Sequence, residues 1–89
     1  MEYALSCTKH AVKRMAVRSI SDEDVDLALG CGVNMHFRNA EHFILRRKDL
    51  AGYGIPRDEW RRLDGLHVIC NSWGEIVTVY REYKSQKVF

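Results

Sequence analysis

The spacing of apolar residues changes at Gly30–Gly32, and this change restricts the folds open to the chain more than any other feature. Before it, apolar residues recur three or four positions apart, as on one side of a helix. After it, Val33, Met35 and Phe37 alternate with polar residues, as in a half-buried strand. The sequence therefore predicts helices first and a sheet second.

Two helices are expected before the change. The first starts near Ser6 or Thr8, whose hydroxyls can cap free amides, and runs to about Arg18. The second follows Ser21, which has nearly the spacing of a capping box with Asp24, and ends at the glycines. Its acidic first turn suits the positive end of the helix dipole, so we assign no metal to those carboxylates.

A first hairpin is expected from strands at 33–38 and 42–48. A two-residue turn at Asn39-Ala40 would put Phe43 on the polar side of the sheet. A three-residue turn at 39–41 sets Phe37 opposite Phe43 and keeps the apolar residues on one face, so this register is predicted.

A second hairpin is expected from a strand at 66–71, a Trp73-Gly74 turn, and a strand from Glu75 to about Tyr83. It predicts four opposed pairs of residues: Cys70 and Val77, Val68 and Val79, His67 and Tyr80, and Ile69 and Thr78.

These elements predict a single α+β domain over residues 1–89. Two N-terminal helices would pack on one face of a four-stranded antiparallel sheet. A short edge strand at 2–5 is a further option. Residues 49–64, with two glycines and Pro56, read as a short irregular insertion that holds at most a short helix.

Composition excludes several classes of protein. The net charge of +2 is too small to indicate nucleic-acid binding alone, although basic residues cluster in the second half. The three cysteines form no Cys-x-x-Cys pair, which disfavours a disulfide framework and a thiolate zinc site. No apolar run approaches a membrane span and no export leader follows Met1. We therefore expect a cytoplasmic protein with no cofactor, no metal and no membrane contact.

One helix face and one sheet face carry the chemistry. His10, Arg14 and Arg18 follow at i, i+4 and i+8, which places an imidazole beside permanent cations, as phosphate handling requires. The predicted hairpins leave a polar sheet face made of His36, Arg38, His42, Arg46, His67, Asn71, Thr78 and Tyr80. Metal-independent RNA cleavage needs such groups, because one must accept the 2′-hydroxyl proton and another must protonate the leaving 5′-oxygen.

The chain also resembles a known family. The motif Thr8-x-His10-Ala11-x-x-Arg14-Met15-x-x-Arg18-x-Ile20-Ser21, and the strand Ile76-Val77-Thr78-Val79-Tyr80-Arg81, are similar to the small bacterial proteins grouped as domain of unknown function 4258. That family is placed by fold with the ribonucleases typified by barnase, EndoU, colicin nucleases and RelE. The resemblance implies an RNA-cleaving toxin with a partner antitoxin, and it points to His10, Arg14, Thr78 and Tyr80.

The working hypothesis is thus a metal-independent endoribonuclease, the toxin of a toxin–antitoxin pair acting on mRNA or tRNA. His10 would be general acid or base, Arg14 the phosphate clamp, and Thr78 with Tyr80 the wall of the site. His67 and His42 are candidates for the second proton-transfer group. RNA-binding residues would be Arg18, Arg38, His42, Arg46 and Arg81.

Two alternatives stay open. A non-catalytic RNA-binding or regulatory protein would use the same basic face without cleaving RNA. An interaction module, for example a homodimer, would use three isoleucines predicted on the open sheet face: Ile44, Ile69 and Ile76.

Overall fold

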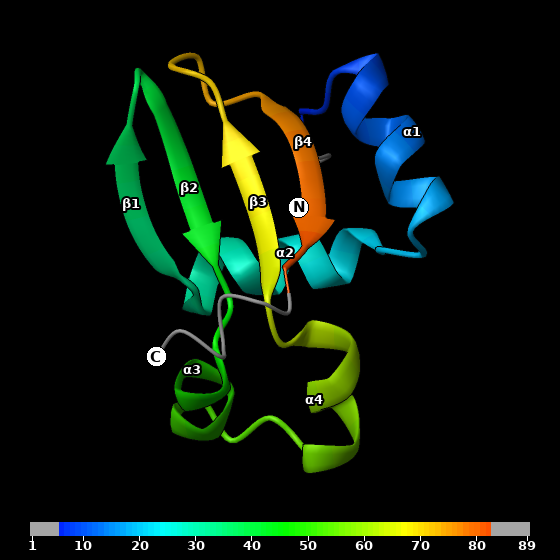
Figure 1. Cartoon of the computed structure of the whole chain (residues 1–89), viewed down its shortest axis with the longest axis vertical. Helices are drawn as coiled ribbons and strands as arrows, with labels where there is room; N and C mark the ends of the chain where they lie inside the picture. Colours follow the sequence, from blue (N-terminus) through cyan, green and yellow to red (C-terminus); the bar gives the residue numbers. More distant parts are fainter. Residues whose placement is uncertain (1–5, 83–89) are drawn as a thin grey trace, which may run out of the picture.

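The structure, a computed structural model, describes residues 6–82 and confirms the predicted α+β class (Figure 1). Its elements are α1 (Lys9–Val17), α2 (Asp22–Cys31), β1 (Val33–Phe37), β2 (Ala40–Ile44), α3 (Arg47–Gly52), α4 (Arg57–Leu63), β3 (Leu66–Cys70) and β4 (Ile76–Arg81). The four strands form one antiparallel sheet in the order β1-β2-β3-β4.

Both N-terminal helices begin where side-chain caps place them. The Thr8 hydroxyl accepts a hydrogen bond from the Ala11 N–H at 3.1 Å. Ser21 and Asp24 exchange two bonds of 3.1 Å each, from backbone N–H to side-chain oxygen, so the capping box is complete. Such a box satisfies two amides that the first turn of a helix leaves free. The predicted start of each helix is confirmed.

The first hairpin turns at Arg38 and Asn39, and the predicted three-residue turn is wrong. Both residues have positive φ, 52° and 63°. This is the primed turn conformation, whose twist matches that of paired strands. Phe37 therefore lies opposite Ala40 and not Phe43.

The second hairpin follows the predicted register over most of its length. The confirmed pairs are Val68 with Val79, His67 with Tyr80, and Ile69 with Thr78. Beyond them the register shifts, so Cys70 lies opposite Ile76 instead of Val77. The shift turns Ile76 into the core, where it is 1% exposed, so its predicted place on the open face is wrong.

The expected irregular insertion at 49–64 folds instead as the two short helices α3 and α4. The start of α3 is fixed by Asp49, whose carboxylate accepts 2.9 Å hydrogen bonds from the backbone N–H and the guanidinium of Arg46. Leu50 and Leu63 anchor the two helices in the core. The strand predicted at 42–48 therefore ends earlier, because β2 stops at Ile44 and α3 begins at Arg47.

The core lies between the sheet and the helices. In Figure 1, α2 passes behind β2 and β3, while α1 packs alongside β4. The buried apolar residues form a single cluster that includes Ala11, Met15, Val25, Ala28, Leu66, Val68, Ile76 and Val79. The other face of the sheet, toward the viewer in Figure 1, carries no helix among the described elements.

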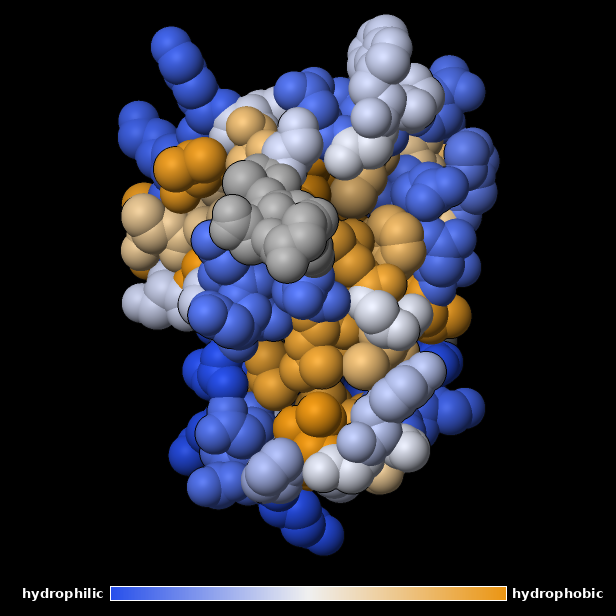
Figure 2. Space-filling view, turned by 180° about the vertical axis from the view of Figure 1, so that it is seen from behind, coloured by the Kyte–Doolittle hydropathy of each residue, from blue (hydrophilic) through white to orange (hydrophobic). Residues whose placement is uncertain are grey.

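The core cluster continues from the sheet toward α3 and α4. Seen from behind, apolar side chains gather down the middle of the molecule, from the level of α2 to the two short helices (Figure 2). Leu27, Ile55 and Trp60 are partly buried and pack against the cluster. In the described part of the chain, no helix has the length and apolar character to cross a bilayer.

The two edges of the sheet differ. Residues 6–8 run beside β4, where the Thr8 N–H donates to the Ile76 carbonyl at 2.9 Å and the Ile76 N–H donates to the Ser6 carbonyl at 2.8 Å. Within residues 6–82, no strand pairs with the outer edge of β1. The edge strand predicted at 2–5 lies outside the described residues.

Candidate functional site

His10 and Arg14 form a hydrogen-bonded pair one turn apart on α1. Thr8 caps the start of this helix. Its hydroxyl also donates to the Val77 carbonyl at 3.4 Å, which connects the start of α1 to β4. The Arg14 Nε donates to the His10 Nε2 over 3.4 Å. The pair therefore places an imidazole beside a permanent positive charge.

Arg18 continues the predicted row on α1 and is exposed. It forms the C-cap of the helix, and its backbone carbonyl accepts a hydrogen bond from Arg81. Of the three residues predicted to form a basic row on this helix, His10 and Arg14 are in direct contact.

The open sheet face differs from the predicted one. The register places His42, His67, Thr78 and Tyr80 on it. His36 lies on the opposite face, where its Nδ1 is 3.9 Å from the Glu41 carboxylate. The reason is the two-residue turn: Phe37 pairs with Ala40 instead of Phe43, and a shift by an odd number of residues moves every side chain of β1 to the other face.

His67 and Tyr80 stack on the open face, opposite each other on β3 and β4. Their ring centroids are 4.6 Å apart and their planes differ by 16°. His67 is buried, and within residues 6–82 neither of its ring nitrogens has a hydrogen-bond partner. Burial lowers the pKa of His67, an effect that the charge of Glu82 opposes. Burial, followed by the charge of Glu82, raises the pKa of Tyr80, so its hydroxyl keeps its proton.

His42 lies further along the same face, beside an exposed aromatic ring. Its imidazole meets Phe37 edge to face, with centroids 6.0 Å apart. The guanidinium of Arg38 lies 5.1 Å from the centre of the Phe37 ring, within the range of a cation–π contact. These three side chains form an aromatic and basic group at the first hairpin turn.

Arg46 and Asn71, both predicted on the polar sheet face, have structural partners instead. The Arg46 guanidinium makes two 2.9 Å bonds to Asp49, whose pKa is lowered chiefly by that contact. The Asn71 side-chain oxygen accepts hydrogen bonds from the Trp73 and Glu75 N–H groups and so closes the second hairpin.

Arg81 also holds the fold together. Its guanidinium donates to three backbone carbonyls: Arg62 at 2.8 Å, Arg18 at 2.7 Å and Ser19 at 3.3 Å. It therefore joins the end of β4 to α4 and to the turn between α1 and α2. The guanidinium has five N–H donors in one plane, which allows it to bind several carbonyls at once. To contact RNA, Arg81 would have to break these hydrogen bonds.

The structure thus divides the predicted site residues into two groups. One is His10 with Arg14 on α1, and the other is the open face of the sheet. Since α1 packs alongside β4, Thr78 and Tyr80 lie on the strand that neighbours this helix, and both face the open side of the sheet. Strands lie about 4.8 Å apart, so His42 on β2 is roughly 10 Å further away than β4.

Two exposed apolar residues on the open face were missed by the sequence analysis. Met35 and Phe37 are 53% and 56% exposed there, although their alternation was interpreted as a core-facing pattern. Asn39 could have indicated the two-residue turn, because asparagine readily adopts the positive φ that this turn requires. Trp73, predicted only as a turn residue of the second hairpin, is 84% exposed at its tip.

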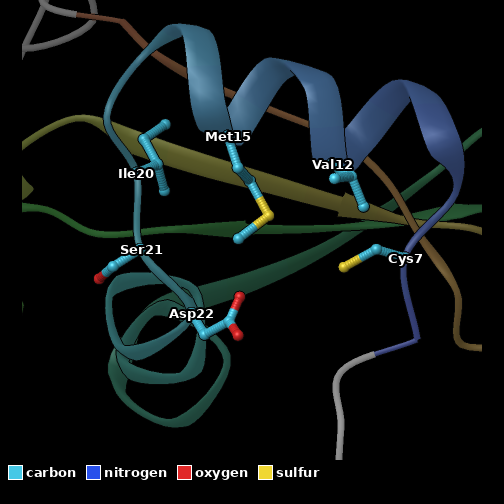
Figure 3. Close-up of a pocket in the computed structure, with 6 residues that line it drawn as sticks. All are labelled: Cys7, Val12, Met15, Ile20, Ser21 and Asp22. Atoms are coloured by element: carbon cyan, nitrogen blue, oxygen red, sulfur yellow. The ribbon is translucent and has the colours of Figure 1, made fainter.

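A cleft of about 460 Å³ lies between α1 and α2 (Figure 3). Apolar side chains and one thiol line it together with the start of α2: Cys7, Val12, Met15, Ile20, Ser21 and Asp22. Burial, and then the charge of Asp22, raise the pKa of the Cys7 thiol. Val12 is two residues from both His10 and Arg14, about 200° around the helix, so this cleft is separate from their pair.

Among residues 6–82, no group of three His, Cys, Asp or Glu side chains is arranged to hold a metal ion. Comparison of the chain with family models, curated proteins and solved structures finds no match.

Proposed function

We propose that this protein is a metal-independent endoribonuclease whose site lies between α1 and β4. The observation that carries the proposal is the direct contact of His10 with Arg14, an imidazole next to a guanidinium on an accessible helix. The imidazole can accept a proton, and the guanidinium can bind a phosphate through two parallel N–H groups.

In the proposed reaction, Arg14 turns from His10 to the phosphate, and the freed Nε2 of His10 takes the proton of a ribose 2′-hydroxyl. The 2′-oxygen then attacks the adjacent phosphorus, and the bond from phosphorus to the 5′-oxygen breaks. Arg14 stabilises the negative charge that the phosphate gains in the transition state. The products are a 2′,3′-cyclic phosphate and a free 5′-hydroxyl.

The leaving 5′-oxygen needs a proton, and Tyr80 is the best placed donor. It lies on β4 beside α1, and its raised pKa keeps the hydroxyl protonated near neutral pH. His67, stacked on the other side of the ring, acts as a positioning residue because its own nitrogens are buried. Thr78 forms the wall of the site on the same strand. His42 lies too far from α1 for proton transfer and contributes to RNA binding instead.

The proposal includes the biological setting that the family resemblance implies. The chain would act in the cytoplasm on mRNA or tRNA as the toxin of a toxin–antitoxin pair, and a cognate antitoxin protein would neutralise it. The small size of the domain and the exposed position of His10 are compatible with such a partner.

The test is incubation of the purified chain with mixed RNA in EDTA, alone and with translating ribosomes. We expect fragments that end in 2′,3′-cyclic phosphate from the wild type and none from the variant with both His10→Ala and Arg14→Ala. Lys13→Ala is the matched control, because it removes an exposed cation from the same helix and leaves the pair intact.

Circular dichroism must show the same helix content in all three proteins. Cleavage that survives in the double variant would refute the assignment of the site. No cleavage by the wild type in either arm would refute the enzyme, and RNA binding without products would then establish the non-catalytic alternative.

A further inference from the structure

The outer edge of β1 is open in the described chain, whereas the outer edge of β4 is bonded at Ile76 by residues 6–8 and flanked by α1. Residues 6–8 hydrogen-bond to β4, but no strand of residues 6–82 lies beside β1. An open edge presents unpaired backbone N–H and C=O groups, which can pair with the edge of another sheet.

The geometry of the first hairpin shows which groups these are. In a two-residue hairpin the residues that flank the turn, here Phe37 and Ala40, exchange backbone hydrogen bonds, and every second residue repeats the pattern. Val33, Met35 and Phe37 therefore direct their backbone groups toward β2. Asn34 and His36 direct theirs outward.

The sequence of β1 does nothing to block this edge. Natural edge strands commonly carry a lysine, a proline or a bulge that prevents pairing between molecules. The strand Val33–Phe37 reads Val-Asn-Met-His-Phe, without proline, lysine, arginine or carboxylate, and its pairing with β2 is regular. Met35 and Phe37 also expose more than half of their side chains on the open face.

We infer that β1 pairs antiparallel with β1 of a second copy, about a two-fold axis at Met35. Among the antiparallel registers that use the outward groups, only this one pairs all five residues of the strand. Asn34 then lies opposite His36 of the second copy, and Phe37 lies opposite its Val33. The two Met35 side chains face each other, so apolar residues meet on one face and polar residues on the other.

Such a dimer would join the two sheets into one of eight strands, with a continuous open face. An interface of one five-residue strand from each copy is smaller than the standard size of stable interfaces, so we expect a dissociation constant on the order of micromolar. The dimer does not depend on the proposed ribonuclease activity.

The first test is sedimentation velocity of the full chain across a hundredfold range of concentration. We expect the weight-average mass to rise from 10.4 kDa toward twice that value. Met35→Lys places two positive charges opposite each other at the axis and should keep the protein monomeric. Val17→Lys is the matched control, since it changes an exposed apolar residue on α1, far from β1, and should leave dimerisation intact.

The second test examines the register by oxidative cross-linking. Met35→Cys should give a covalent dimer, because opposed residues of a non-hydrogen-bonded antiparallel pair have Cβ atoms about 4.5–5.5 Å apart. Phe37→Cys is similarly exposed, but the two cysteines would be four positions apart along the strands, about 13 Å, and should not cross-link.

The wild type sets the background from its native thiols. A chain that is monomeric at every concentration would overturn the inference. A dimer that survives Met35→Lys, or that cross-links equally through either cysteine, would overturn it as well.

Discussion

Gly32 marks the closest approach of α2 to β2, and replacing it by alanine tests how tightly these elements pack. A Cβ at this position would lie 2.7 Å from the Ala28 carbonyl oxygen and 2.9 Å from the Ile44 carbonyl oxygen. Both atoms belong to the backbone, and the Ala28 oxygen already accepts the Gly32 N–H at 2.9 Å. Neither can move unless the last turn of α2 or the strand moves with it.

The expected effect of Gly32→Ala is a loss of stability of about 1–3 kcal/mol, the usual range when a methyl group is forced into packed structure. For a domain of this size, a loss of about 2 kcal/mol lowers Tm by roughly 8–16 °C. The measurement is urea unfolding followed by circular dichroism, with a lower midpoint and an unchanged slope.

Gly30→Ala provides the matched control on the same helix. No atom lies within 4 Å of a Cβ there, and the residue is helical, so alanine should stabilise the protein by about 0.5–1 kcal/mol. The opposite signs expected for Gly30→Ala and Gly32→Ala make the comparison decisive. A Gly32→Ala protein as stable as the wild type would show that the close approach does not exist.

Two further predictions concern residues first singled out for function. Burial lowers the pKa of His67 in the folded protein. Below about pH 6.5 the unfolded chain therefore binds a proton at this histidine more readily than the folded chain does. The free energy of unfolding should fall as the pH falls. His67→Phe keeps a ring against Tyr80, so its urea midpoint should drop less between pH 7.5 and 5, and an equal drop would contradict the buried neutral histidine. Arg81→Ala removes three hydrogen bonds to carbonyls and should reduce the free energy of unfolding by roughly 1–3 kcal/mol. Arg81→Lys keeps the charge without the planar donors, and full recovery of stability by lysine would refute the structural role.

The helices could be predicted from the sequence because their limits depend on neighbouring residues. Thr8 and Ser21 supply capping oxygens to amides three residues ahead, and the side chain of Asp24 returns the bond. These contacts form within one turn of the chain. The alternating residues of the second hairpin predicted its register as far as Ile69 and Thr78, but the predicted Trp73-Gly74 turn was wrong, because the register shifts and the Asn71 N–H donates to the Glu75 carbonyl.

The first hairpin could not be predicted from its apolar pattern. Matching Phe37 to Phe43 assumed that both side chains face the core. The backbone twist at Arg38 and Asn39 favoured a tighter turn, and it exposed Met35 and Phe37 on the open face. A local turn preference therefore overrode the pairing of apolar residues.

By itself the sequence determined the fold class, the caps of the helices and the adjacency of His10 and Arg14, since each depends on spacing along one element. The tertiary structure alone decided how the other charges are used. Arg47 on α3 is bound to Asp64 after α4, and Arg81 joins segments more than sixty residues apart. A guanidinium looks the same in a sequence whether it faces RNA or a carbonyl, and only folding brings its partner within hydrogen-bond distance.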